Sequence, residues 1–392
     1  MKGEGSFNDW FWTMIRFVSR RALWGLVTLA LLVSFAFIAV NLLLPYDFAV
    51  GLGQRSRNIE RIREQLGLDR PLWVRWLDYM WHFVRGDLGE SYDGYRVSSY
   101  IWSPLPTTVM IFAVGGVVAY LLGEWLGRLV AWSRSRVLTA ASSTVSVLLF
   151  SAFPPWLIFL LTYFVGDRLA QLRSWAGLQP VTGTAPGGPI AVVLAVGLLV
   201  AFITGIALRG WARRNQRRAL GLLAIPAGLA GFALGLVISG TWTDAVDQML
   251  WPSALTAMLA LILIAFGESM LVMRAGVSAE MAEDYVLTAR AKALPERLIR
   301  DGHVAPNAVL PTLSRLFTSV PYLISGLVII ELSSGTYALG SLFFYAIESG
   351  NVPIIIGIIA IVGVIGLVLR IALDIVQAII DPRIIRADGE PS

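Results

Sequence analysis

The sequence predicts an all-α, polytopic membrane protein. Of its 392 residues, 56% are hydrophobic and only 15% are charged, and the mean hydropathy is +0.70. A soluble domain carries about 25% charged residues, so this composition excludes a disordered chain and makes a single soluble domain a poor explanation. The apolar residues also fall into blocks of about 20, which is the length that a helix needs to cross a bilayer.

Eight apolar blocks have the length of membrane-spanning helices. In chain order they cover about 22–44, 106–127, 137–165, 190–208, 219–239, 252–273, 316–334 and 353–373. Arginines gather in the loops that this count places inside, while the short outside loops carry few, so both termini are predicted to be cytoplasmic. Before the first span, apolar and aromatic residues repeat at helical spacing from Phe7 to Val18, which predicts an interfacial helix along the cytoplasmic surface.

The residue inventory excludes several classes of function. Only two of the 31 basic residues are lysines, Lys2 and Lys292, and neither follows a GxxxxGK[ST] loop, so this chain does not bind ATP by that route. It has no cysteine, which removes thiolate chemistry and cysteine metal sites. Its two histidines, His82 and His303, are far apart in sequence, so we expect neither a metal nor a cofactor in this chain.

The segment 45–105 is predicted to be extracytoplasmic, with short helices at Asn58–Leu66 and Leu72–Val84. The second carries Trp73, Trp76 and Tyr79 at three-residue spacing. We expect it to pack on the membrane surface or on a partner subunit; direct contact with a soluble substrate-delivery protein is the alternative.

The loop 275–315 is predicted to be the longest cytoplasmic loop and to contain a short helix. Ser278 can cap this helix, and Pro295 ends its regular part. Acidic residues come first and basic residues last, which complements the helix dipole: they are Glu280, Glu283, Asp284, Arg290 and Lys292. One face combines apolar, aromatic and hydroxyl side chains: Met281, Tyr285, Thr288 and Ala289. Such a helix either plugs into a groove on another protein or covers the end of the helix bundle.

The stretch EMAEDYVLTARAKALPERLIRDGHVAPNAVLP (280–311) resembles the cytoplasmic EAA-type loop of ABC importer permeases. Its DYVxTARAK form is similar to that of the dipeptide/oligopeptide permease family, B-type subunit. Further motifs occur in the family's order: LGLDRPL, GDLGES, LPTT, NVPIIIG and DPRI. The resemblance covers about 1–189 and 245–386.

The resemblance implies a type I ABC importer permease bundle (MetI-like) of about eight membrane-spanning helices, two of them an inserted hairpin. Five segments follow: 1–44 with the interfacial helix and first span; 45–105 outside; 106–189 with the second and third spans; 190–244 as the hairpin; and 245–392 as the permease core with its coupling loop. The family usually lacks the hairpin, whose role the sequence does not reveal.

The implied function is that of a non-catalytic permease subunit in the prokaryotic cytoplasmic (inner) membrane, half of the pathway of an ATP-driven importer of di- or oligopeptides. Its implied partners are a second permease, two cytoplasmic ATPases that hold the ATP and Mg, and an extracytoplasmic binding protein. Oligosaccharides, nickel chelates and glutathione are alternative substrates. A stand-alone secondary transporter or channel is the alternative class, although it would need more polar residues at mid-membrane than this sequence offers.

Two groups of site residues are predicted. The ATPase-coupling residues are Glu280, Glu283, Asp284, Tyr285, Thr288, Ala289, Arg290, Lys292 and Ala293, with Asp284, Tyr285, Thr288 and Arg290 as the main docking residues. Ala293 stands where the family has glycine, which can alter the turn after the helix. The pathway or gate candidates are Glu268, Glu331, Pro154 and Pro155, because charges and prolines within spans are functional suspects.

Overall fold

The computed structural model describes residues 4–43, 70–166, 168, 171, 174–175, 197–205, 228–231, 233 and 251–380. The regular elements in this part of the chain are helices, as the composition predicted. Four helical segments are long and apolar enough to cross a membrane: Met14–Leu43, Val97–Ala131, Pro252–Glu280 and Val352–Ile375. Two bent helix pairs raise the total to six if each pair forms one span. Most of the predicted hairpin at 190–244, and the predicted helix Asn58–Leu66, lie outside the described residues.

The chain divides into two compact units. One contains α1 (Glu4–Leu43), α4 (Leu72–Val84), α5 (Val97–Trp102), α17 (Leu339–Glu348) and α18 (Val352–Ile380). The other contains most of α6 (Leu105–Ala131), then α7 (Arg136–Phe150), α8 (Pro154–Leu161), η1 (Thr162–Gly166), α13 (Pro252–Glu280), α14 (Asp284–Ala291), α15 (Glu296–Leu298), η2 (Ile299–Val304) and α16 (Ala305–Ser334).

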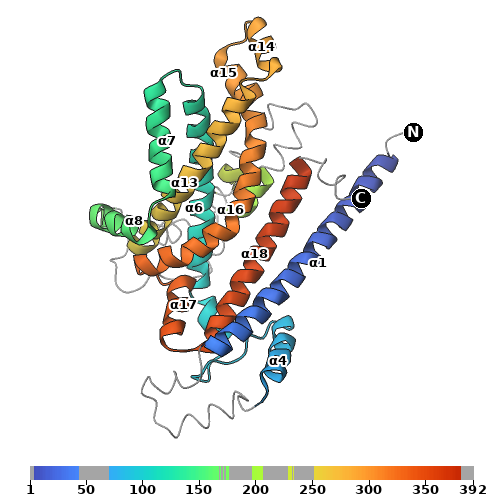
Figure 1. Cartoon of the computed structure of the whole chain (residues 1–392), viewed down its shortest axis with the longest axis vertical. Helices are drawn as coiled ribbons and strands as arrows, with labels where there is room; N and C mark the ends of the chain where they lie inside the picture. The colour runs from blue at the N-terminus through green and yellow to red at the C-terminus, as the bar shows by residue number, and fades with distance from the viewer. Residues whose placement is uncertain are drawn as a thin grey trace. The chain divides into compact units, whose positions relative to one another are not determined.

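In the first unit, α1 and α18 lie side by side and run in opposite directions (Figure 1). Close approach is possible because glycines face leucines. A Cβ at Gly25 would clash with a methyl of Leu367, and a Cβ at Gly363 would lie 2.7 Å from a methyl of Leu29. This is the small-residue packing that brings membrane helices together.

The helix α1 is continuous from Glu4 to Leu43, which corrects the prediction of a separate interfacial helix. No proline interrupts the chain in this range, so Phe7–Val18 extends the spanning helix. Its Phe17 is buried against Ala378, which gives the extension a packing partner within its own unit.

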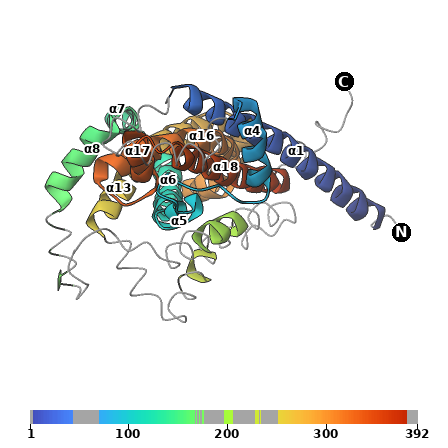
Figure 2. The ribbon, with the colours of Figure 1, turned by 90° about the horizontal axis from the view of Figure 1, so that it is seen from below.

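The helix α4 confirms the predicted Leu72–Val84 helix and packs beside the C-terminal end of α1 and the N-terminal end of α18 (Figure 2). Trp76 and Tyr79 pack against Phe37 and Val352. Arg75 Nη2 also donates a hydrogen bond to Asn41 Oδ1 at 2.7 Å.

In the second unit, the predicted third span 137–165 is broken: α7 ends at Phe150, and the axis turns by 104° before the segment Pro154–Gly166. Within a continuous span, Pro154 and Pro155 would kink the helix. Instead they begin α8, where the missing N–H costs no helical hydrogen bond. Phe153 before them is extended, as a residue preceding proline prefers.

The helices α13 and α16 pack against each other in this unit, and α13 also packs on α7. The predicted seventh span 316–334 is the second half of α16, which begins eleven residues earlier, at Ala305. It ends at Gly335, whose left-handed φ of +65° closes the helix. The long helices therefore leave only residues 281–304 between them, a shorter connection than the predicted loop 275–315.

Candidate functional site

The segment between α13 and α16 contains the predicted coupling helix, but the helix begins later than expected. Ser278 does not cap it: α13 continues to Glu280, and the Ser278 hydroxyl donates to the carbonyl of Arg274. After a turn at 281–283, α14 runs from Asp284 to Ala291 with Glu283 as its N-cap residue. Acids at its start and Arg290 in its last turn match the predicted dipole arrangement.

The predicted face of Met281, Tyr285, Thr288 and Ala289 is only partly kept. Met281 precedes the helix, because the chain turns at 281–283, and the other three residues lie within α14. They are not equally exposed: Thr288 is exposed, Tyr285 is half-buried and Ala289 is buried, as is Val286.

The exposed face of α14 carries four residues at the spacing i, i+3, i+4 and i+7, which places them in one stripe. They are Asp284, Leu287, Thr288 and Ala291. Leu287 is 60% exposed. The sequence analysis does not select it, although it follows Asp284 by three residues and therefore lies on the same face of the helix. This stripe is the part of α14 that its own chain leaves uncovered.

Tyr285 turns inward and holds α14 against the ends of the two long helices. Its hydroxyl donates to Glu280 Oε2 at 2.6 Å, and Asn307 Nδ2 donates to the Tyr285 oxygen at 3.3 Å. Burial, with the bond to Glu280, raises the pKa of Tyr285 to about 12, so the phenol keeps its proton and remains a donor.

Arg290 also binds within the segment. Its Nε lies 3.2 Å from Glu296 Oε1, and its guanidinium lies 5.8 Å from the ring centre of Trp132. Of the predicted main docking residues, Asp284 and Thr288 therefore lie in the exposed stripe, while Tyr285 and Arg290 bind their own chain. Lys292 is exposed at the C-cap.

Ala293 adopts the left-handed conformation that the family's glycine would adopt, with φ of +53°. The turn is a Schellman motif: the N–H of Ala293 donates to Arg290 O, and the N–H of Leu294 donates to Ala289 O. The alanine therefore does not alter the turn. It costs roughly 1–2 kcal/mol instead, because its Cβ crowds the carbonyl oxygen.

The segment η2 ties this region to α6. Arg300 makes two hydrogen bonds to Asp301, of 2.9 and 2.7 Å, and these lower the pKa of the Asp301 carboxyl. Arg128 Nη1 of α6 lies 4.0 Å from the same carboxylate. The segment 281–304 is thus held by polar contacts near both of its ends.

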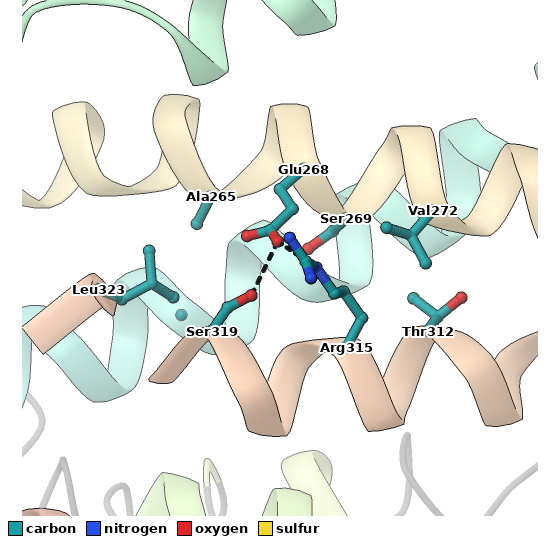
Figure 3. Close-up of a pocket in the computed structure, with 9 residues that line it drawn as sticks. Ala265, Glu268, Ser269, Val272, Thr312, Arg315, Ser319 and Leu323 are labelled. Atoms are coloured by element: carbon teal, nitrogen blue, oxygen red, sulfur yellow. Dashed lines mark hydrogen bonds and ion pairs between the residues drawn. The ribbon is translucent and has the colours of Figure 1, made fainter. Parts of the chain in front are cut away.

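The predicted pathway candidate Glu268 lies in α13 and binds the neighbouring helix α16. Its Oε1 accepts hydrogen bonds from Arg315 Nε and Ser319 Oγ, each at 2.8 Å (Figure 3). The three residues line a pocket between α6, α13 and α16. Arg315 is a residue of this pocket that the sequence analysis does not select. Glu331 is buried at the far end of α16, and the structure does not bring it to this pocket.

These features define a class of protein: a multi-span helical membrane protein with a short helix between two long helices. A family model described as "Binding-protein-dependent transport system inner membrane component" matches residues 123–386, and a model of the N-terminal part of such components matches 14–111. The chain belongs to this family. It is therefore a multi-pass, non-catalytic permease component of a binding-protein-dependent ABC transporter of the inner membrane, a class of complex that includes a binding protein and ATPases.

The chain is similar along its length to bacterial peptide permeases. The "Probable D,D-dipeptide transport system permease protein DdpB" of Escherichia coli (strain K12) is 26% identical over 97% of this chain and 99% of the relative. A Brucella suis biovar 1 (strain 1330) protein named "Putative peptide permease protein" is 26% identical over 95% and 99%. The "Oligopeptide transport system permease protein OppB" of Mycobacterium bovis (strain ATCC BAA-935 / AF2122/97) is 24% identical over 95% and 99%.

Proposed function

We propose that this permease moves di- or oligopeptides inward and forms half of a translocation pathway with a second, related permease. The observation that carries the substrate class is that relatives matching at least 95% of this chain bear names of peptide, dipeptide or oligopeptide permeases. The eight-span topology, with both termini cytoplasmic and a hairpin at 190–244, is part of this proposal.

In this mechanism, α14 is the coupling helix. ATP and Mg bind to the two partner ATPases, and closure of the ATPase pair moves α14. The motion passes to α13 and α16 because the bonds of Tyr285 to Glu280 and Asn307 hold α14 to the ends of both helices. A rigid connection of this kind transmits a two-state change between distant sites.

The exposed stripe of α14 makes the direct contact with the ATPase. Leu287 and Ala291 supply apolar area, and Asp284 and Thr288 supply polar groups at the edge. The other predicted coupling residues, such as Arg290 and Lys292, fix the shape of the segment or flank the stripe. Glu268, Pro154 and Pro155 stay candidates for the pathway or its gate, as does Glu331.

The test begins with purification of the chain from its native membrane and identification of the proteins that co-purify. Two ATPases, a second permease and a binding protein are the expected result. Mass spectrometry of the ligand retained by that binding protein should then detect peptides, and proteoliposomes holding the complex should take those peptides up only with ATP.

Other outcomes distinguish the alternatives. If the binding protein holds an oligosaccharide, a nickel chelate or glutathione, the proposed substrate class is wrong, while the proposed ATP-driven import mechanism still stands. A chain that purifies alone and takes up substrate with an ion gradient would contradict the proposed mechanism.

A further inference from the structure

The pocket between α6, α13 and α16 concentrates polar side chains in a part of the chain that is otherwise apolar. Its lining includes Glu268, Ser269, Thr312, Arg315 and Ser319 (Figure 3). Polar groups are expensive within a membrane, so such a concentration indicates a functional site.

Glu268 and Arg315 are unequally exposed. The Glu268 side chain is 12% exposed and is held by two donors, whereas the Arg315 side chain is 57% exposed. Arg315 donates to Glu268 through Nε, and its two Nη groups make no hydrogen bond to any residue in the described ranges. Those Nη groups form a planar fork of donors, the geometry that binds a carboxylate with two hydrogen bonds.

The pair lies within the membrane-spanning part of the chain and not beyond the end of α13. Glu268 lies 16 residues after Pro252, the start of the spanning helix α13, which is about 24 Å at 1.5 Å per residue. This is within a hydrocarbon core of about 30 Å. Charged groups at such depths face water-filled cavities or protein, so we take the exposed side of Arg315 to face the pathway.

The pocket also has room beside the charges. A Cβ added at Gly116 of α6 would meet no atom within 4 Å, whereas one at Gly123, two turns along the same helix, would lie 2.5 Å from Ser269. The Gly116 side of α6 is therefore open where the pocket lies, and tightly packed further along.

We propose that Arg315 binds a carboxylate of the transported substrate inside the pathway, with Glu268 and Ser319 holding its guanidinium in position. This rests on the proposed function, because a peptide supplies the carboxylate at its C-terminus. Glu268 keeps the Nε side of the guanidinium occupied and directs the Nη fork toward the incoming anion.

The test uses the absence of cysteine from this chain. Gly116→Cys places a single thiol in the pocket of the complete transporter, assembled with cysteine-free partner subunits in proteoliposomes. Two methanethiosulfonate reagents then modify this thiol: the anionic sulfonatoethyl reagent and the cationic trimethylammonium-ethyl reagent. The rate of each reaction is divided by the rate of the same reagent with a free thiol in solution, and the two ratios are compared. We expect the anionic reagent to be favoured at least fivefold, since Gly116 and Arg315 line the same pocket and a nearby charge acts strongly at low effective dielectric.

Three further substitutions, each combined with Gly116→Cys, test which side chain causes this preference. Arg315→Gln should lower the anionic preference about tenfold, and the charge-conserving Arg315→Lys should retain most of it. Glu268→Gln should raise it, because the neighbouring negative charge is removed. A thiol that reacts in no state of the transport cycle, or that reacts without charge preference, would overturn the proposal.

Protection by substrate completes the test. In the Gly116→Cys variant that keeps Arg315, trialanine should slow modification of the thiol. Trialanine amide, which lacks the carboxylate, should protect the thiol at least fivefold less. Equal protection by the two, or none by either, would overturn substrate binding at Arg315. Failure of the proposed function is detected separately, as absent ATP-driven peptide uptake, because the charge preference does not depend on the substrate class.

Discussion

The helices α14 and α4 are both short and lie outside the long apolar helices, yet their exposed faces differ in kind. The exposed stripe of α14 mixes Asp284, Thr288 and Ala291 with a single large apolar residue, Leu287. The exposed stripe of α4 is apolar throughout and consists of Trp73, Leu77, Trp81 and Val84. A mixed surface suits a protein contact that forms and moves, whereas an aromatic, apolar stripe is typical of a helix at the membrane interface.

The two helices are also anchored differently. Tyr285 of α14 is fixed by hydrogen bonds to groups on α13 and α16, while Trp76 and Tyr79 of α4 pack into an apolar cluster with Phe37. Directional bonds transmit a displacement to particular helices, and apolar packing mainly holds an element in place. The comparison therefore supports the proposed coupling role of α14 and favours a structural role for α4.

The largest effect is expected from a charge in the centre of the α14 stripe. Leu287→Asp should leave the complex assembled but lower peptide uptake per ATP hydrolysed more than tenfold, because it places a charge at the centre of the docking contact. Uptake and hydrolysis are measured together in proteoliposomes. The matched control Leu287→Met keeps the volume and should retain coupling; equal loss in both variants would contradict the assigned role.

A smaller effect is expected from loosening the anchor. Tyr285→Phe removes the hydroxyl that donates to Glu280, a hydrogen bond to a charged group worth about 1.5–3 kcal/mol. Hydrogen exchange of the α14 amides should accelerate about tenfold or more. Tyr322→Phe, at an exposed residue of α16, is the control and should leave α14 unchanged. Unchanged exchange in both variants would show that the bond does not hold α14.

A gain in stability is expected at the end of α14. Ala293→Gly should stabilise the turn by about 1 kcal/mol, because glycine adopts the observed φ of +53° without strain. Ala291→Gly, in the last turn of the helix proper, should instead destabilise it by about 1 kcal/mol. Hydrogen exchange of the Leu294 amide reports both, and shifts of the same sign would refute the assignment of strain to position 293.

The smallest effect on coupling is expected in α4. Leu77→Ser should lower the free energy of unfolding by less than about 1 kcal/mol. It should leave peptide uptake per ATP hydrolysed unchanged, since this stripe anchors α4 and does not take part in coupling. Asp78→Ser on the neighbouring polar side is the control. If Leu77→Ser abolishes stimulation of hydrolysis by the binding protein, α4 is a contact for that protein, and its structural role is wrong.

The sequence predicted the helices whose signals are local and strong. The sequence located the helix α4 and the starts of α13 and α18 to within a residue or two. Both long helices continue seven residues beyond their predicted ends, α13 to Glu280 and α18 to Ile380. Two local signals misled: Pro154 begins a new helix instead of kinking one, and Ser278 lies inside α13. The partner of Glu268 could not be predicted, because Arg315 is 47 residues away and only the packing of α16 on α13 brings them together.

Cross-linking from position 287 in the purified, assembled transporter tests the central claim most directly. A benzophenone maleimide attached through Leu287→Cys should form an adduct with an ATPase subunit on illumination, and its yield should change when ATP is added. The same reagent attached through Trp73→Cys on α4 should form none with the ATPase. Absence of an ATPase adduct at position 287, in a complex that still hydrolyses ATP and takes up substrate, would contradict the account.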